Sequence, residues 1–291
     1  MLELPMVMPP IRLLAVDIDG TLLNPQFQIS DADLAALRRA NQEGVEVVVV
    51  TGRRHTFALP IVKQLGFDLW IISSNGAITR SMSGETFHCD FLPAEACRKL
   101  CKATPQFRGS MVLTFDVEGK GAVVLERLND ELTGSIQRWL EKNLEYIDFV
   151  IPLENSLTTD PVQAMFCGRI ERMHQALTAI ANSGIEKEIT VLRTEYLLRD
   201  LSIVDILNQG CSKGHALERW ANYRGIPREQ VMAVGDNYND VEMLAFAGVP
   251  FIMGNACEEL RGRGWNVTLC NDQNGVAAAI EQVLGAVKVS V

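Results

Sequence analysis

The sequence lacks the features that mark membrane-spanning, secreted and nucleic-acid-binding proteins. None of its apolar runs approaches the roughly 20 residues that a membrane-spanning helix needs, and its first ten residues lack the basic segment of a signal peptide. Basic side chains are in deficit, because 27 Lys and Arg stand against 36 Asp and Glu, which gives a net charge of −9. We therefore expect neither nucleic acid nor a membrane as a partner.

The seven cysteines form no metal-binding or redox motif. Their number is odd, they are scattered, and none has Cys-x-x-Cys spacing. Such a pattern is typical of reduced thiols, so we expect a cytoplasmic protein. The sequence contains no repeat or low-complexity tract, and it makes no prediction of oligomeric state.

Both ends of the 291-residue chain alternate between strand-like and helix-like segments. The apolar, β-prone segments are residues 11–16, 45–50 and 69–73 near the start, and 231–234, 249–253 and 267–269 near the end. Helical segments lie between them, one of them capped by Ser30 and another beginning after Ser212. This order predicts an α/β core with a doubly wound, Rossmann-like parallel sheet.

The middle of the chain has a different pattern. We predict strands near residues 111–115, 122–125, 162–167 and 190–192, with helices near 93–102, 130–144 and 171–182. Strands interleaved with helices in this way indicate an α+β cap domain inserted into the core. The predicted organisation is therefore a core in two parts, 1–89 and 203–291, around a cap at 90–202.

Two carboxylates, Asp17 and Asp19, follow the first predicted strand. Carboxylates this close repel one another unless a cation or a shared proton lies between them. Thr51 and Asp236 also follow strands, and Lys213 begins a helix. Since ligands bind at the carboxyl ends of strands in open α/β sheets, we expect these side chains to form one site.

This combination suits phosphoryl transfer through a covalent aspartyl phosphate. Asp17 is the candidate nucleophile and a metal ligand, while Asp19 can protonate the leaving oxygen and later deprotonate water. Thr51 and the backbone N–H groups beside it can hold a phosphoryl oxygen, and Lys213 can pair with Asp17 and the phosphate.

A magnesium site completes the predicted chemistry. Asp236 supplies a carboxylate, and Asp240, four residues later on the same helical face, is a supporting or additional ligand. Taken singly, each of these residues is an ordinary turn residue, helix cap or solvated side chain. Only their combination, each at an expected edge of the sheet, points to catalysis.

The motifs resemble those of the haloacid dehalogenase superfamily of phosphohydrolases. The four motifs are Asp17-Ile18-Asp19-Gly20-Thr21, Thr51-Gly52-Arg53, Lys213, and Gly235-Asp236-Asn237-Tyr238-Asn239-Asp240. Ser73-Ser74-Asn75-Gly76-Ala77 and Gly254-Asn255-Ala256 also look like the Cof-type subgroup, in which a class IIB cap is inserted between the second and third motifs.

The resemblance implies a Mg²⁺-dependent phosphatase for small phosphorylated metabolites such as sugar phosphates. It implies metal ligation by Asp17, the Asp19 backbone carbonyl and Asp236, with Asp240 on the metal side. The implied phosphate-binding residues are Thr51, Gly52, Arg53, Asn75, Lys213 and Asn239. The cap is expected to close over the site and select the substrate.

Two other functions remain open from the sequence. A phosphotransferase or phosphomutase uses the same intermediate but delivers the phosphoryl group to a sugar hydroxyl. A non-enzymatic phospho-acceptor regulator needs Asp17 but has no need of an acid/base at Asp19. We expect His55, which follows the second motif, to be a surface residue.

Overall fold

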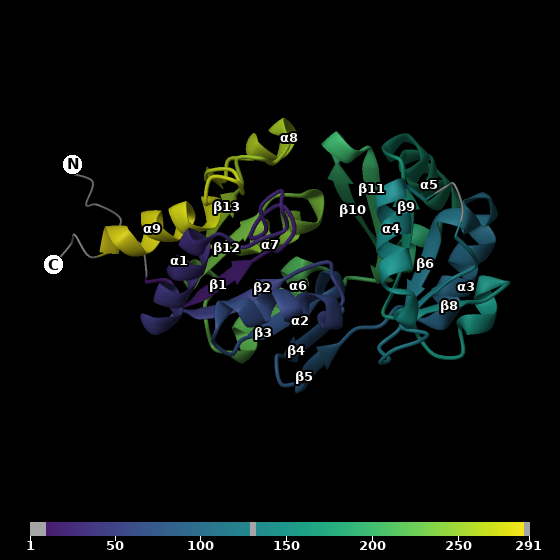
Figure 1. Ribbon diagram of the computed structural model, residues 1–291, viewed down its shortest axis with the longest axis horizontal. Coiled ribbons are helices and arrows are strands. Elements are labelled where there is room, and N and C mark those ends of the chain that lie inside the picture. The colour runs from purple at the N-terminus through teal and green to yellow at the C-terminus, as the bar shows by residue number, and fades with distance from the viewer. Residues whose placement is uncertain (1–9, 129–131, 288–291) are drawn as a thin grey trace. The chain divides into compact units, whose positions relative to one another are not determined.

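The computed structural model describes residues 10–128 and 132–287. Contacts divide the chain into two compact units (Figure 1). The core unit takes in Met1–Phe87 and Lys213–Val291, and the inserted unit is His88–Ser212.

The core unit is built on an eight-stranded sheet of order β14-β13-β12-β1-β2-β3-β4-β5. Its strands are β1 (Leu13–Val16), β2 (Glu46–Val50), β3 (Trp70–Ser73), β4 (Ile78–Ser81), β5 (Thr86–Cys89), β12 (Val231–Gly235), β13 (Val249–Ile252) and β14 (Asn266–Val267). The strands from β14 to β3 pair in parallel, whereas β4 runs antiparallel to β3. In β1, Val16 pairs with Val49 and Val234, so the first and last parts of the chain share one sheet.

Helices cover both faces of this sheet, as the sequence predicts. They are α1 (Asp31–Gln42), α2 (His55–Val62), α6 (Lys213–Tyr223), α7 (Val241–Phe246), α8 (Glu258–Arg261) and α9 (Gly275–Val287). Because side chains alternate along a strand, Leu14 and Val16 pack with α1, α2 and α9, while Leu13 and Ala15 pack with α6, α7 and α8. A sheet buried on both faces holds its strand ends rigidly, which suits them to position a site.

The inserted unit has a six-stranded sheet of order β10-β11-β9-β6-β7-β8. Its elements are α3 (Ala94–Ala103), β6 (Met111–Thr114), β7 (Val123–Leu125), α4 (Gly134–Lys142), β8 (Ile147–Phe149), β9 (Gln163–Gly168), α5 (Ile170–Ser183), β10 (Ile189–Tyr196) and β11 (Leu201–Asn208). Strand β10 with β11, β11 with β9, β9 with β6 and β6 with β7 pair antiparallel, whereas β7 and β8 pair in parallel. One face packs against α3 and α5, and Leu100, Met173 and Phe166 belong to one buried hydrophobic cluster there. The first residues of the helix predicted at 130–144 lie outside the described part of the chain.

The sequence did not predict β8, β11 or the β4–β5 hairpin. Strand β11 pairs with β10 from Leu201 to Asn208 and also with β9, so this sheet continues beyond residue 202. The β4 segment, Ile78–Ser81, includes Thr79, Arg80 and Ser81, and therefore gives only a weak apolar strand signal.

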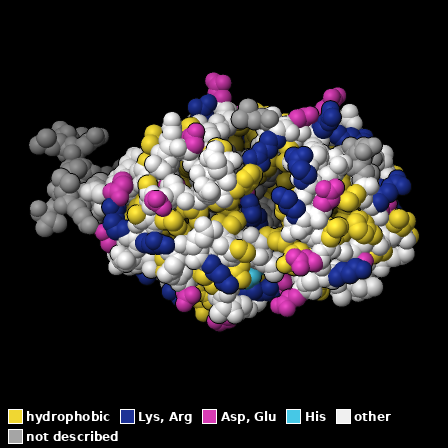
Figure 2. Space-filling view, viewed as in Figure 1, with side chains coloured by type: hydrophobic (Ala, Val, Ile, Leu, Met, Phe, Trp, Pro, Cys, Tyr) yellow, Lys and Arg dark blue, Asp and Glu magenta, His cyan; other side chains and the backbone are white. Residues whose placement is uncertain are grey.

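The cysteines, the surface charges and the helix lengths complete the description of the fold. All seven cysteines are free thiols. Acidic and basic side chains both appear on the viewed face of each unit (Figure 2). Among the described helices, none is long and apolar enough to cross a membrane.

Candidate active site

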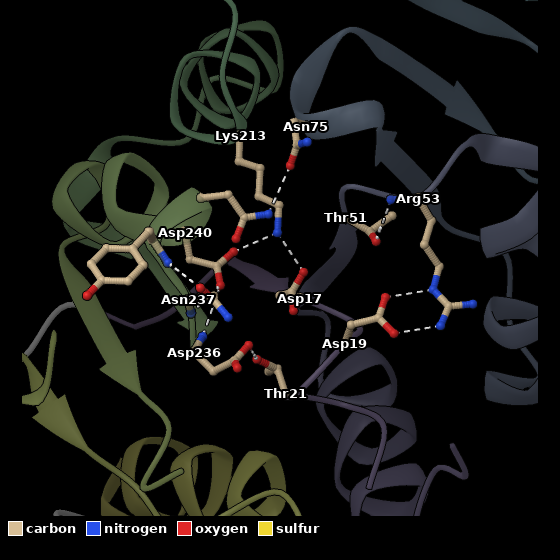
Figure 3. A network of polar contacts seen from close by, with 12 residues as sticks. Asp17, Asp19, Thr21, Thr51, Arg53, Asn75, Lys213, Asp236, Asn237 and Asp240 are labelled. Carbon is tan, nitrogen blue, oxygen red and sulfur yellow. Dashed lines mark hydrogen bonds and ion pairs between the residues drawn. The ribbon is translucent and has the colours of Figure 1, made fainter. Parts of the chain in front are cut away.

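Four adjacent parallel strands of the core sheet end at one edge, and residues of the predicted motifs follow their ends. In the order β12, β1, β2 and β3, the residues that follow the strand ends are Asp236, Asp17, Thr51 and Ser74. Parallel strands end at the same edge, so residues far apart in the sequence meet there (Figure 3).

Lys213 joins the first motif to the fourth. Its Nζ donates to Asp17 Oδ1 at 2.6 Å and to Asp240 Oδ1 at 2.7 Å. All three residues are buried. The next residue, Gly214, lets α6 approach α7 closely, because a Cβ there would lie 2.5 Å from the carbonyl carbon of Glu242.

Asp240 uses both carboxylate oxygens on protein donors. Oδ1 accepts from Lys213, and Oδ2 accepts from the backbone N–H groups of Asp236 at 2.9 Å and Asn237 at 3.0 Å. Asn237 and Asp240 form a capping box at the turn that precedes α7. Asp240 therefore orients Lys213 and the loop that carries Asp236.

Asp17, Asp236 and Asp240 form a buried acidic cluster. One oxygen from each lies within 4.8 Å of the others. Burial raises the pKa of Asp17 to about 7 although Lys213 opposes the rise, and burial with the Asp17 charge raises the pKa of Asp236 well above its usual range. Burial opposes the charge on Lys213, but Asp17 and Asp240 outweigh it and raise the pKa of that ammonium.

The donor set of this cluster fits a hard divalent cation. Mg²⁺ binds carboxylate and carbonyl oxygens in preference to nitrogen or sulfur. Three buried carboxylates face one buried ammonium, so the cluster has a negative excess that a divalent cation would offset.

Gly20 and Thr21 fix the Asp236 carboxylate. Thr21 donates its hydroxyl to Asp236 Oδ1 at 3.1 Å. Gly20 has a φ of +85°, and a Cβ there would lie 2.3 Å from Asp236 Oδ2. Asn255 in turn donates to the Gly20 carbonyl at 2.9 Å. The sequence places these residues in the Asp-Gly-Thr and Gly-Asn-Ala motifs, but it does not predict that they position Asp236.

Asp19 is paired with Arg53. Both carboxylate oxygens accept from the guanidinium, Oδ2 from Nε at 2.6 Å and Oδ1 from Nη2 at 2.5 Å. About a quarter of each side chain is exposed, 26% for Asp19 and 29% for Arg53. The Asp19 carboxylate faces Arg53, whereas Asp17 faces Lys213 (Figure 3). Arg53 was predicted to contact phosphate, and in the structure its guanidinium lies on Asp19.

Thr51 begins a turn that is held from two sides. Its hydroxyl accepts the Arg53 backbone N–H at 3.1 Å, and its carbonyl accepts the Asn75 N–H at 3.0 Å. Ser74 N–H donates to the Arg53 carbonyl at 2.8 Å. The backbone of the second motif is thereby fixed to the loop after β3.

That loop has an unusual backbone and an unpartnered amide. Ser74, Asn75 and Gly76 have positive φ angles of 49°, 54° and 105°, a conformation that is costly for residues other than glycine and that concentrates at functional sites. Asn75 Oδ1 accepts from Asn239 Nδ2 at 2.9 Å, but its own Nδ2 is buried without a hydrogen-bond partner. Gly52 leaves room for the amide, since a Cβ there would lie 3.1 Å from Asn75 Oδ1.

The prediction that His55 is a surface residue is wrong. His55 is the first residue of α2 and is 8% exposed, with Nε2 3.0 Å from the Ser81 carbonyl oxygen. Ser81 belongs to the β4–β5 hairpin. Because the sequence did not predict that hairpin, it could not supply the partner that makes burial of an imidazole acceptable.

Comparisons with known proteins identify the family of this chain. The family model for haloacid dehalogenase-like hydrolases matches residues 14–280. Phosphatase YwpJ of Bacillus subtilis is 31% identical over 94% of this chain and 100% of its own length. The HMP-PP phosphatase of Escherichia coli strain K12 is 29% identical over 86% of this chain and 86% of its own length.

Solved structures show the same fold. A haloacid dehalogenase-like hydrolase from B. subtilis aligns with a TM-score of 0.78 and 26% identity over 94% of this chain and 100% of that chain. One from Bacteroides thetaiotaomicron aligns with a TM-score of 0.76 and 27% identity over 94% and 99%. With strand ends, motifs and relatives in agreement, the chain belongs to the haloacid dehalogenase superfamily of phosphohydrolases, in its Cof-type subgroup.

Proposed function

We propose that this phosphatase is a Mg²⁺-dependent phosphomonoesterase that acts on small phosphorylated metabolites through an aspartyl phosphate on Asp17. The observation that carries the proposal is the buried cluster in which Lys213 contacts Asp17 and Asp240 beside Asp236. A nucleophilic carboxylate, a fixed cation and an excess of oxygen ligands are the parts that this reaction requires.

The metal would be held by Asp17, Asp236 and the backbone carbonyl of Asp19. Asp240 would support this site without ligating the ion, because its oxygens already accept from Lys213 and two backbone N–H groups. When bound, Mg²⁺ supplies positive charge that shields the Asp17 carboxylate from the negative charge of an incoming phosphate.

The chain's own residues then perform two transfers. An oxygen of Asp17 attacks phosphorus, the bond from phosphorus to the leaving oxygen breaks, and Asp19 gives that oxygen a proton. Water next attacks the phosphorus of the phosphoenzyme, and Asp19 takes its proton. The bond to Asp17 breaks, so one ester and one water yield one alcohol and one phosphate.

Three donors would hold the phosphoryl oxygens. Lys213 supplies an ammonium, Thr51 a hydroxyl, and Asn75 the Nδ2 that has no protein partner. Asn239 keeps the Asn75 amide in place by donating to its oxygen. A buried donor left without a partner costs roughly 1–3 kcal/mol, which favours its use on a ligand.

The substrate class rests on the family and on charge. Relatives at 29–31% identity carry the names HMP-PP phosphatase and phosphatase YwpJ. The net charge of −9 disfavours polyanionic macromolecules. Sugar phosphates and similar small metabolites are therefore the proposed substrates. The proposal includes a cytoplasmic location, which the odd number of cysteines favours.

The test is a screen of phosphorylated metabolites with the purified full-length chain, with and without Mg²⁺. We expect release of inorganic phosphate that needs Mg²⁺ and is lost in Asp17→Asn. The exposed variant Lys63→Ala serves as the control for handling and expression. If the wild-type chain released no phosphate from any member of a broad panel, or if Asp17→Asn remained active, the proposal would be wrong.

A further inference from the structure

The Arg53–Asp19 pair is an ionic contact at the site to which the proposed chemistry gives no role. Its two hydrogen bonds, at 2.6 and 2.5 Å, form a fork on both carboxylate oxygens. A bidentate fork fixes the plane of a carboxylate as well as its position. Asp19 is the group that must meet the leaving oxygen, so whatever fixes its plane affects proton transfer.

The backbone beneath Arg53 is also fixed. The Arg53 N–H donates to the Thr51 hydroxyl, and the Arg53 carbonyl accepts from Ser74. Within residues 10–128 and 132–287, the Asp19 carboxylate accepts hydrogen bonds from no side chain other than Arg53. The Arg53 backbone is thus fixed on two sides, and the fork carries that constraint to the Asp19 carboxylate.

From this geometry we infer that Arg53 is a positioning residue for Asp19 and is not a ligand of the phosphoryl group. The inference rests on the proposed function, because it assigns Asp19 the proton transfer to the leaving oxygen. Arg53 holds the Asp19 side chain in the orientation in which its protonated form gives a proton to that oxygen and the resulting carboxylate later accepts the proton of water. A lysine in its place supplies the charge without the fork, so it restores the orientation only in part.

Two substrates with different leaving groups separate positioning from phosphate binding. An alkyl phosphate needs a proton on its leaving oxygen, whereas p-nitrophenyl phosphate releases a stable phenolate without one. In Arg53→Ala we expect kcat/KM for the alkyl ester to fall on the order of 100-fold, the scale of general acid catalysis. We expect kcat/KM for p-nitrophenyl phosphate and inhibition by inorganic phosphate to change less than about threefold.

A double-mutant cycle gives the second readout. If Arg53 acts through Asp19, then Arg53→Ala costs nothing further in an Asp19→Asn background. Arg53→Lys should recover part of the alkyl-ester activity. Circular dichroism and the thermal midpoint establish that each variant is folded, and Lys63→Ala controls for the loss of one surface cation.

The contrary results are equally specific. Equal losses for both esters, with at least tenfold weaker inhibition by inorganic phosphate, would show that Arg53 binds the phosphoryl group. Unchanged or faster turnover of the alkyl ester would show that the fork holds Asp19 in an unproductive orientation. Either result overturns the inference while the wild-type chain remains a phosphatase. A wild-type chain without phosphatase activity would instead overturn the proposed function.

Discussion

Lys213 Nζ lies 2.6 Å from Asp17 Oδ1, although 196 positions separate the two residues in the sequence. The inserted unit ends at Ser212, so Lys213 is the first residue of the chain after its return to the core. It is also the first residue of α6. The packing of α6 on α7 at Gly214 then places its ammonium between the first and fourth motifs.

Replacing this ammonium should damage both stability and activity. In Lys213→Met, Asp17 and Asp240 remain buried without their cation, and breaking a buried ion pair costs about 3–5 kcal/mol. We expect urea unfolding to report a loss of that order and phosphatase activity to be lost. The matched substitution at exposed Lys63 should change neither quantity. Retention of both in Lys213→Met would contradict the assigned role.

Substitution of the two motif carboxylates should have unequal effects. Asp17→Asn removes the nucleophile, so we expect no turnover and no phosphoenzyme. Asp19→Asn keeps the nucleophile but lacks the base that activates water, so we expect slow hydrolysis and an accumulated phosphoenzyme. Acid quench followed by intact-mass measurement detects the added phosphoryl group. A phosphoenzyme in Asp17→Asn would place the nucleophile elsewhere.

Gly20 provides a test of the metal site. In Gly20→Ala the Cβ would lie 2.3 Å from Asp236 Oδ2, which forces that carboxylate to move. Since residues that orient metal ligands contribute about 10–100-fold in affinity, we expect the Mg²⁺ concentration for half-maximal activity to rise by that factor.

Gly44→Ala is the matched control for Gly20→Ala. Gly44 has a φ of +88°, close to the +85° of Gly20, but nothing lies within 4 Å of a Cβ built there. Both variants therefore incur the left-handed backbone cost, roughly 1–2 kcal/mol, and only one disturbs Asp236. An equal shift in Mg²⁺ dependence in the two variants would mean that backbone strain alone is responsible.

The sequence predicts the parts of this site that depend on strand ends. Asp17, Thr51 and Asp236 follow apolar, β-prone segments, and the parallel pairing of β12, β1 and β2 brings such positions together. The sequence also predicts that Lys213 meets Asp17, because a buried carboxylate nucleophile needs a nearby cation. Short motifs are enough for these predictions, because they depend only on where strands end and on which side chains are charged.

The sequence could not predict the direction in which the side chains of the site point. Arg53 could have pointed at a phosphate or at Asp19, because both are anionic and both are within reach of its long side chain. The sequence predicted Asp240 on the metal side of the site, and it could not show that both of its oxygens accept from Lys213 and backbone N–H groups. Predicting the burial of His55 required the β4–β5 hairpin, whose short, partly polar strands are hard to recognise in the sequence.

We expect the Arg108–Glu154 pair to make the stability of the inserted unit depend on pH. Arg108 donates to both Glu154 oxygens, through Nη1 at 2.7 Å and also through Nη2. These hydrogen bonds lower the pKa of Glu154. The unfolded-state pKa of a glutamate is about 4.3. A carboxyl whose folded-state pKa is lower than this stabilises the folded protein at pH values above about 4.3. The contribution disappears as pH falls through the folded-state pKa.

Glu154→Gln should therefore lower the free energy of unfolding by about 1 kcal/mol at pH 7, and the difference from wild type should shrink as pH falls below about 4. Urea unfolding of the full chain from pH 3 to pH 8 measures it. Glu188→Gln removes a similar but half-exposed pair with Lys99, where water screens the charges, so we expect no measurable effect at any pH. A Glu154→Gln deficit that stayed constant down to pH 3 would indicate lost packing, because only an ionic contribution vanishes when the wild-type carboxylate takes up its proton.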